Sequence, residues 1–203
     1  QDSITQVTPL VAEGIMYLHS ANTMFALNAS TGEELWRRPL DSGRAGGPVR
    51  GSTYASGRIY AYRGADLYAF DAETGEEIRS FGETGVVQVI TDALNFKYPD
   101  VYPNNTDPIN LGYRLTTPPT VHNGKMYVAA ALSEGHIPGG LVIRIDASSG
   151  AVEWVFNTVP QTPSDSGWEI ARDTWGTGQR AGGGVWTPPA IDTEFGLVYV
   201  NAG

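Results

Sequence analysis

Gly14-Ile15-Met16-Tyr17 is the first of four copies of one short stretch, and these copies decide the fold. The other three are Gly57-Arg58-Ile59-Tyr60, Gly124-Lys125-Met126-Tyr127 and Gly196-Leu197-Val198-Tyr199. Each copy follows a small polar turn and begins a run rich in β-branched, aromatic and small residues, which is typical of a β-strand entered through a tight turn. The repeated stretch therefore predicts the beginning of a strand.

A second repeated element follows the first three copies and has the form Asp/Asn-Ala-x-Ser/Thr-Gly. It occurs at 28–32, 71–75 and 146–150, between apolar flanks. The Asp or Asn side chain can bond back to the backbone and the glycine supplies a positive φ, so this element predicts a hairpin turn. Strand, hairpin and strand recur with a period of roughly 40–50 residues, lengthened by later insertions, which indicates propeller blades rather than helical solenoids.

We therefore predict an all-β fold, a β-propeller built from four-stranded antiparallel blades, as one partial propeller domain over residues 1–203. The modules are expected at about 7–45, 49–85, 115–160 and 185–203, with irregular insertions at about 86–114 and 160–181. About three and a half blades are expected, whereas a closed propeller needs about four to eight. The sequence is therefore expected to be part of a longer chain.

The residues at the ends of the last strands predict how the blades contact one another. Trp36 and Trp154 end equivalent strands, where a large ring can wedge between adjacent blades. Arg79 stands at the matching place in the second module, so that blade is expected to pack differently. The Pro/Asn-rich stretch 98–105 in the first insertion is interpreted as a solvated connector, with a binding loop as the alternative.

The composition is that of a globular protein with a sizeable core, with 203 residues, 41% of them hydrophobic, including ten Tyr and five Trp. Thirteen Lys and Arg against 22 Asp and Glu give a net charge of −9, which disfavours nucleic acid and anionic membrane surfaces as partners. No apolar stretch approaches the roughly 20 residues of a membrane-spanning helix. The absence of Cys excludes disulfides and thiolate metal sites in this sequence and leaves cytosol and periplasm both open.

No standard catalytic motif is present. His19, His122 and His136 are far apart and lack metal-ligand spacing, so we interpret them as surface or packing residues. The run Gly182-Gly183-Gly184 lacks the Lys-Ser/Thr that follows a phosphate loop. Beside Trp186, however, a glycine run allows a flat ligand to approach the backbone closely.

The order and spacing of several modest motifs resemble the pyrroloquinoline quinone (PQQ)-dependent alcohol and sugar dehydrogenases, a family of eight-bladed propellers with the quinone on the central axis. The resemblance extends over nearly the whole chain. Its motifs are the stretch 8–17, Val49-Arg50-Gly51, the three hairpin turns, Ser133-Glu134-Gly135 and Gly182-Gly183-Gly184-Val185-Trp186.

The resemblance implies roles for five residues. Arg50 corresponds to an Arg that hydrogen-bonds the quinone oxygens, a role suited to a charged fork of donors. Thr116 corresponds to a Thr that bonds a cofactor carboxylate, Trp186 to a Trp that forms the floor under the planar quinone, and Gln6 to an axial Glu or Gln. Glu134 corresponds to a Glu that ligates Ca²⁺, since hard cations prefer oxygen ligands. The alternative roles are structural: a surface Arg leaving a turn, a Thr at a strand start, a core Trp and an exposed loop Glu.

Three departures from the family pattern limit this implication. The stretch Gly43 to Gly47 lacks the adjacent Cys pair of the methanol and ethanol enzymes, which puts electron transfer by that route in doubt. Ala131 replaces a cofactor-bonding Ser of some relatives, although Ser133 lies nearby. The catalytic Asp is expected beyond Gly203, so no catalytic residue is expected within the chain. The second metal ligand, an Asn, and a Lys or Arg that contacts the quinone are also expected beyond Gly203.

The resemblance thus implies part of a PQQ-dependent dehydrogenase, which oxidises the hydroxyl of a small-molecule alcohol or sugar by hydride transfer to the quinone with assistance from Ca²⁺. It also implies an electron acceptor such as a cytochrome or ubiquinone and a periplasmic location, and we expect the isolated chain to be inactive. The alternative function is a non-catalytic PQQ-repeat propeller that acts as a protein-assembly scaffold and needs no axial Arg, Glu and Trp. A propeller lyase or hydrolase that uses Asp and His is a third hypothesis, which three scattered His residues do not favour.

Overall fold

The computed structural model describes residues 6–41, 43, 48–102, 106–130 and 136–203. Its strands form three four-stranded antiparallel sheets and one two-stranded sheet, which we call blades 1 to 4 in chain order. Blade 1 contains β1 (Leu10–Ala12), β2 (Ile15–His19), β3 (Thr23–Asn28) and β4 (Glu34–Pro39), and blade 2 contains β5 (Thr53–Ala55), β6 (Arg58–Arg63), β7 (Asp66–Asp71) and β8 (Val86–Val87). Blade 3 contains β9 (Thr120–His122), β10 (Lys125–Ala130), β11 (Leu141–Asp146) and β12 (Val152–Asn157), and blade 4 contains β13 (Ala190–Asp192) and β14 (Leu197–Tyr199).

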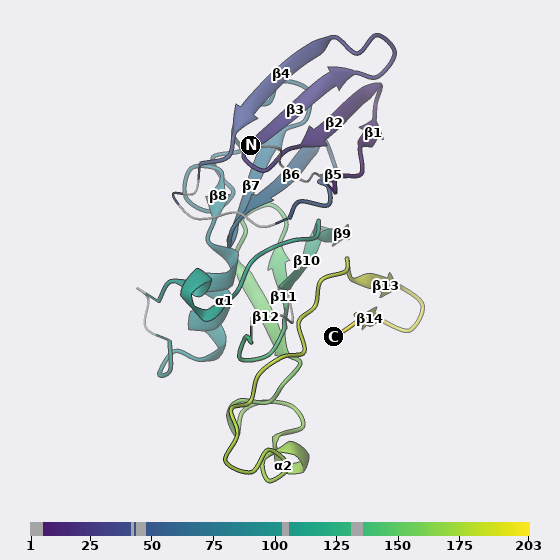
Figure 1. Cartoon of the computed structure of the whole chain (residues 1–203). Helices are drawn as coiled ribbons and strands as arrows, with labels where there is room; N and C mark the ends of the chain where they lie inside the picture. Colours follow the sequence, from purple (N-terminus) through teal and green to yellow (C-terminus); the bar gives the residue numbers. More distant parts are fainter. Residues whose placement is uncertain (1–5, 42, 44–47, 103–105, 131–135) are drawn as a thin grey trace.

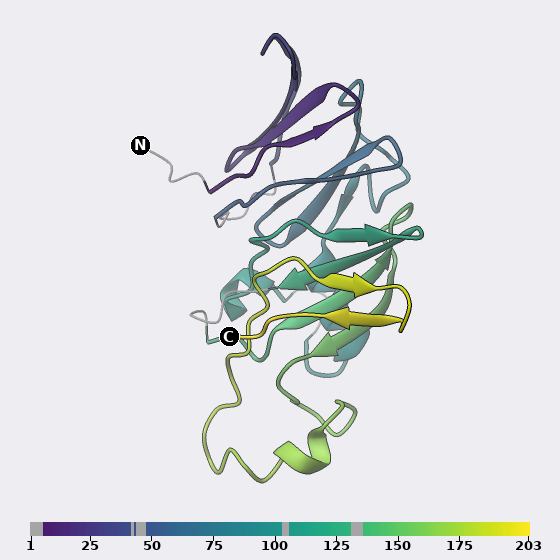
Figure 2. The ribbon, with the colours of Figure 1, turned by 90° about the vertical axis from the view of Figure 1, so that its right-hand side faces the viewer.

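The blades follow one another with their first strands on a common side. β1, β5, β9 and β13 all lie toward the right in Figure 1, and Figure 2, viewed from that side, shows blades 1 to 3 one below another and blade 4 in front of blade 3. This is the radial arrangement of a β-propeller, in which the first strand of each blade is innermost, and it confirms the predicted all-β, partial propeller fold. Within the described ranges, the helices are all too short or too polar to cross a lipid bilayer.

The Asp/Asn-Ala-x-Ser/Thr-Gly elements form the predicted hairpin turns. In blade 2, Asp71 Oδ1 accepts hydrogen bonds from two N–H groups of the turn at 2.8 and 3.1 Å, and Gly75, at a φ of +70°, donates to the Asp71 carbonyl at 2.9 Å. Asn28 in blade 1 and Asp146 in blade 3 accept the same pair of backbone bonds. The side chain supplies an acceptor that the turn's backbone lacks, which explains why this pattern recurs.

The repeated tyrosine connects neighbouring blades. The Tyr17 hydroxyl donates to the Ala72 carbonyl of blade 2 at 3.0 Å, and the Tyr60 hydroxyl donates to the Ala147 carbonyl of blade 3 at 2.8 Å. Both acceptors belong to the hairpin turn of the next blade. Ala72 also donates its N–H to the Gly57 carbonyl of its own blade at 2.9 Å, and Ala147 makes the equivalent bond. The two repeated motifs therefore form one unit that joins each blade to the next.

Trp36 wedges between blades 1 and 2, as predicted. The ring is 7% exposed, its Nε1–H donates to the Ala72 carbonyl at 3.1 Å, and it lies against the backbone of Gly75. The apolar core between blades 1 and 2 gathers around this ring and the buried Ile59. A second apolar core fills the space between blades 2 and 3 and continues into the first insertion.

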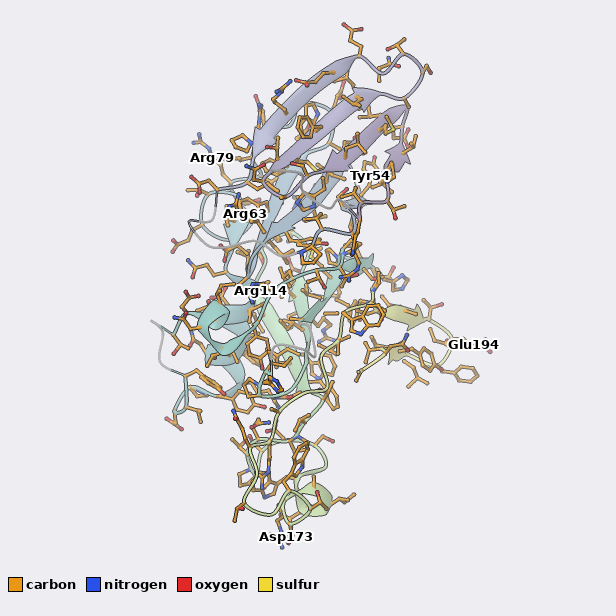
Figure 3. All side chains as sticks on the ribbon, viewed as in Figure 1. Tyr54, Arg63, Arg79, Arg114, Asp173 and Glu194 are labelled. Carbon is orange, nitrogen blue, oxygen red and sulfur yellow. The ribbon has the colours of Figure 1, made fainter. Side chains whose placement is uncertain are left out.

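Blade 2 packs differently, but the prediction that its last strand ends at Arg79 is wrong. After the hairpin turn the chain forms only an isolated bridge with β7, and the fourth strand is β8, which pairs with β7 further along. Arg79 is exposed and points away from the blades (Figure 3). Trp36 of blade 1 packs against Gly75 of blade 2. At the equivalent contact between blades 2 and 3, Phe81 and Val87 pack against Gly150.

The first insertion contains helices where the sequence predicted only irregular structure. These are α1 (Val89–Lys97) and a short 3₁₀ helix, η1 (Pro108–Leu111). The apolar face of α1 packs against β7 and β12, and Lys97 forms an ion pair with Asp165 of the second insertion, with Nζ and Oδ1 2.7 Å apart. The second insertion contains α2 (Trp168–Ala171) and extends away from the blades, with Asp173 at its outer end (Figure 3). The ion pair thus ties the two insertions together beside blade 3.

Candidate cofactor-binding site

Three of the five predicted site residues occupy the same place in different blades. In these blades an inner-strand residue pairs with the repeated tyrosine, namely Leu10 with Tyr17, Thr120 with Tyr127 and Ala190 with Tyr199. Gln6, Thr116 and Trp186 each stand at the same sequence distance before that inner-strand residue. The segments that lead into the inner strands enter from one side of the stack (Figure 2). The repeat therefore places these positions at one end of the inner strands.

Arg50 brings blades 2, 3 and 4 together at this end. It precedes β5, and its Nη1 donates a hydrogen bond to the Thr116 carbonyl at 3.2 Å. Its Cζ lies 5.7 Å from the centroid of the Trp186 ring, within the range of a cation–π interaction. Arg50, Thr116 and Trp186 thus meet although they are far apart in sequence. Their roles toward a cofactor stay predictions.

The exposure of these side chains suits a binding surface. Thr116 is 1% exposed and Arg50 is half-buried, whereas the ring of Trp186 is 42% exposed in this chain. Within the described part of the chain, no carboxylate forms an ion pair with Arg50. An exposed ring beside a guanidinium offers a flat π surface and charged donors at one place.

The glycine run before Trp186 allows two chain segments to touch. The Thr158 hydroxyl donates to the Gly183 carbonyl at 2.7 Å and accepts from the Gly140 N–H at 2.8 Å. A Cβ at Gly183 would lie 2.6 Å from Thr158 Oγ1, and the φ of +65° also favours glycine. This close contact holds the backbone that leads to Trp186, so the run contributes to the site through packing.

The other two predicted site residues do not join this group in what the structure describes. Gln6 is exposed and, among the described residues, makes no hydrogen bond with the three side chains above. Glu134, the predicted calcium ligand, lies outside the described residues. No cluster of three or more His, Asp and Glu suited to a metal ion occurs within the described ranges.

Sequence reasoning missed that two buried residues, His19 and Tyr62, lie behind Arg50. The Arg50 N–H donates to the Tyr62 hydroxyl at 3.0 Å, and His19 Nδ1 lies 3.2 Å from the carbonyl oxygen of Gly51. His19 and Tyr62 follow the repeated tyrosine at the same distance in β2 and β6, so aligning the repeats would have shown that they are equivalent. Burial lowers the pKa of His19 to about 4. His19 is therefore a packing residue, which is one of the two roles predicted for the histidines. The half-buried His122 and the exposed His136 lie at the surface, which is the other.

Comparisons with known proteins agree with this fold. A PQQ family model, described as "Glucose/ethanol/alcohol dehydrogenase, beta-propeller domain", matches residues 1–203. Quinohemoprotein alcohol dehydrogenase ADH-IIG of Pseudomonas putida is 30% identical over 100% of this chain and 27% of its own length. The structure of the quinohemoprotein alcohol dehydrogenase ADHIIG from Pseudomonas putida HK5 has a TM-score of 0.73 at 28% identity, over 98% of this chain and 28% of that chain.

One further solved structure is similar at a lower identity. BamB from Moraxella catarrhalis has a TM-score of 0.52 at 11% identity, over 97% of this chain and 46% of that chain, so it shares the fold alone. The chain spans about a quarter of the length of the curated relatives it matches, for example 27% of an alcohol dehydrogenase subunit from Komagataeibacter europaeus that is 30% identical over 97% of this chain.

Proposed function

The chain belongs to the family of PQQ-dependent dehydrogenase β-propeller domains, and on this premise we propose that it forms the cofactor-binding part of a dehydrogenase that oxidises an alcohol or sugar hydroxyl. The observation that carries the proposal is the meeting of Arg50, Thr116 and Trp186 from three blades. A propeller that only held other proteins would need the blades but no such group. The names of the relatives, which include quinohemoprotein alcohol dehydrogenases, support the same substrate class.

The described residues fit a planar, anionic quinone. The exposed face of Trp186 would carry the rings, because a large π surface binds a flat ligand with little rearrangement. Arg50 would donate to the quinone oxygens, because its charged guanidinium offers a fork of donors that suits an anion. Thr116 and Gln6 complete the predicted cofactor contacts from blades 3 and 1. Bound PQQ supplies a quinone carbonyl that accepts hydride from the substrate.

The metal and the rest of the chemistry belong to the same proposal. We assign Glu134 as a calcium ligand, because a carboxylate suits a hard cation that polarises a neighbouring carbonyl. We place the catalytic Asp beyond Gly203 and therefore expect the isolated chain to be inactive. The proposal also includes a periplasmic location and a cytochrome or ubiquinone as electron acceptor.

Equilibrium dialysis of PQQ against the natural, full-length protein, with and without Ca²⁺, tests the proposal. We expect Ca²⁺-dependent uptake, and we expect Arg50→Ala to weaken it about 10- to 100-fold, since a hydrogen bond to a charged group contributes roughly 1.5–3 kcal/mol. Arg58→Ala is the matched control, because Arg58 also lies in blade 2 and donates to carbonyls of blade 3, at 3.3 and 3.2 Å, but at the hairpin end of the blade.

Two results would count against the proposal. Full-length protein that takes up no PQQ in the presence of Ca²⁺ would favour the scaffold function. Equal weakening by Arg50→Ala and Arg58→Ala would mean that the loss reflects blade packing rather than a contact with the quinone.

A further inference from the structure

The short segment that carries Arg50 is held by hydrogen bonds on three sides. The Arg50 N–H donates to the Tyr62 hydroxyl at 3.0 Å, and the Arg50 carbonyl accepts from the Thr8 N–H at 3.1 Å. The next carbonyl, that of Gly51, lies 3.2 Å from His19 Nδ1. Two of these partners come from blade 1 and one from blade 2, so the segment is fixed at the junction of the two blades.

His19 and Tyr62 support each other as well as this segment. His19 is 1% exposed and Tyr62 is fully buried, and their rings meet edge to face with centroids 5.0 Å apart. A carbonyl oxygen only accepts hydrogen bonds, so Nδ1 must carry the proton and donate it to Gly51. Burial holds the pKa of His19 near 4, which keeps the ring neutral around pH 7. The pair is therefore a buried, uncharged support.

The side chain of Arg50 makes its own bond across to blade 3. Its guanidinium reaches the Thr116 carbonyl at 3.2 Å and the Trp186 ring at 5.7 Å. The orientation of the guanidinium therefore depends on the position of the Arg50 backbone. Removing the Tyr62 hydroxyl would leave a partly buried N–H without its acceptor, and the segment would have to shift to find another.

We propose that His19 and Tyr62 are positioning residues that hold the Arg50 segment so that its guanidinium meets the cofactor carried by Trp186. This inference rests on the proposed function of Arg50 as a quinone-binding residue. His19 acts through the Gly51 carbonyl and Tyr62 through the Arg50 N–H, and neither needs to touch the cofactor.

The experiment measures the dissociation constant of PQQ, by equilibrium dialysis with Ca²⁺, for variants of the natural, full-length protein. Tyr62→Phe keeps the ring that packs on His19 and removes only the hydroxyl, and His19→Leu removes the donor to Gly51. We expect each to weaken PQQ binding about 10- to 100-fold, as residues that orient a ligating group commonly do. His19→Asn, whose amide can donate from nearly the place of Nδ1, is expected to restore most of the affinity.

Tyr17→Phe is the matched control for loss of a buried hydroxyl. Tyr17 is 1% exposed and joins blade 1 to blade 2 through the Ala72 carbonyl at 3.0 Å, but its partner is the hairpin turn rather than the Arg50 segment. We expect Tyr17→Phe to bind PQQ as the parent protein does. Equal loss in Tyr17→Phe and Tyr62→Phe would overturn the inference, because general loosening of the blades would then explain both.

A double variant separates this inference from the proposed function. If Tyr62 acts through Arg50, adding Tyr62→Phe to Arg50→Ala causes no further loss of PQQ affinity. Additive losses would overturn the positioning role while leaving Arg50 as a quinone-binding residue. Parent-like PQQ binding by Arg50→Ala alone would overturn the proposed function of Arg50, and the positioning role with it.

Discussion

Replacing Gly75 with alanine is expected to destabilise the protein more than the same change at Gly57, although both glycines belong to blade 2 and have nearly the same backbone conformation. Gly75 has a φ of +70° and Gly57 a φ of +75°. A Cβ at Gly75 would lie 2.6 Å from Cδ2 and 2.9 Å from Cε3 of Trp36, whereas a Cβ at Gly57 would meet nothing within 4 Å. The two variants therefore share the backbone strain and differ in the contact between blades.

The magnitude follows from these two contributions. A side chain in the left-handed region costs about 1–2 kcal/mol, and this is the whole effect expected for Gly57→Ala. At Gly75 the methyl group must also displace the Trp36 ring, which is 7% exposed and donates to the Ala72 carbonyl. Overpacking of this kind adds about 1–3 kcal/mol, so we expect about 2–5 kcal/mol in total for Gly75→Ala.

Denaturant unfolding followed by tryptophan fluorescence measures the free energy of unfolding of both variants. A second change tests the cause: Trp36→Leu shortens the opposing side chain, so the double variant Trp36→Leu/Gly75→Ala should lose less stability than the sum of the single variants. Equal destabilisation by Gly57→Ala and Gly75→Ala, together with additive losses in the double variant, would refute the reasoning.

Three further predictions concern buried polar groups. Tyr60→Phe removes the 2.8 Å bond to the Ala147 carbonyl between blades 2 and 3, and denaturant unfolding should show a loss of about 1–3 kcal/mol. Burial raises the pKa of Asp165, but Lys97 and backbone donors lower it more, so the net pKa is depressed. Lys97→Met should therefore lower the free energy of unfolding by about 3–5 kcal/mol at neutral pH. The difference between the variant and the parent protein should shrink once unfolding is measured below the usual aspartate pKa of about 3.9. Because the pKa of His19 is lowered to about 4, the unfolded chain binds the proton more readily between about pH 6.5 and 4, so stability should fall as pH falls through this window. His19→Asn should flatten that part of the pH profile, and an unchanged slope would argue against a buried neutral His19.

The local sequence was enough to predict the turns and the strands next to them. The bonds that Asp71 accepts in its turn, and the φ of Gly75, depend on residues within the turn, so the motif specifies them wherever it occurs. The wedge formed by Trp36 was also predictable from its place at the end of the strand after the turn, although the equivalent Trp154 is 40% exposed. The family resemblance added the residues of the candidate site, which composition and periodicity alone did not indicate.

The helix α1 shows where local reasoning fell short. Its residues include Val89, Ile90, Ala93 and Leu94, a spacing that places apolar side chains on one helical face, and all four are buried. A helix of nine residues is marginal by itself, and this one is stabilised by packing on β7 and β12. The partner strands lie on both sides of it in the sequence, so the stabilising contacts could not be read from the stretch alone.

The sequence by itself determined the repeating unit of this protein: a strand that starts at Gly-x-x-Tyr, a hairpin turn that closes on an Asp or Asn, and blades that must therefore follow one another. Only the tertiary structure decided which side chains meet between blades. Arg50, Thr116 and Trp186 come together, and His19 and Tyr62 stand behind Arg50, because blades arranged around a common axis bring equivalent positions of separate repeats to one end of the inner strands. No local pattern contains that geometry, since it depends on the angle between whole blades.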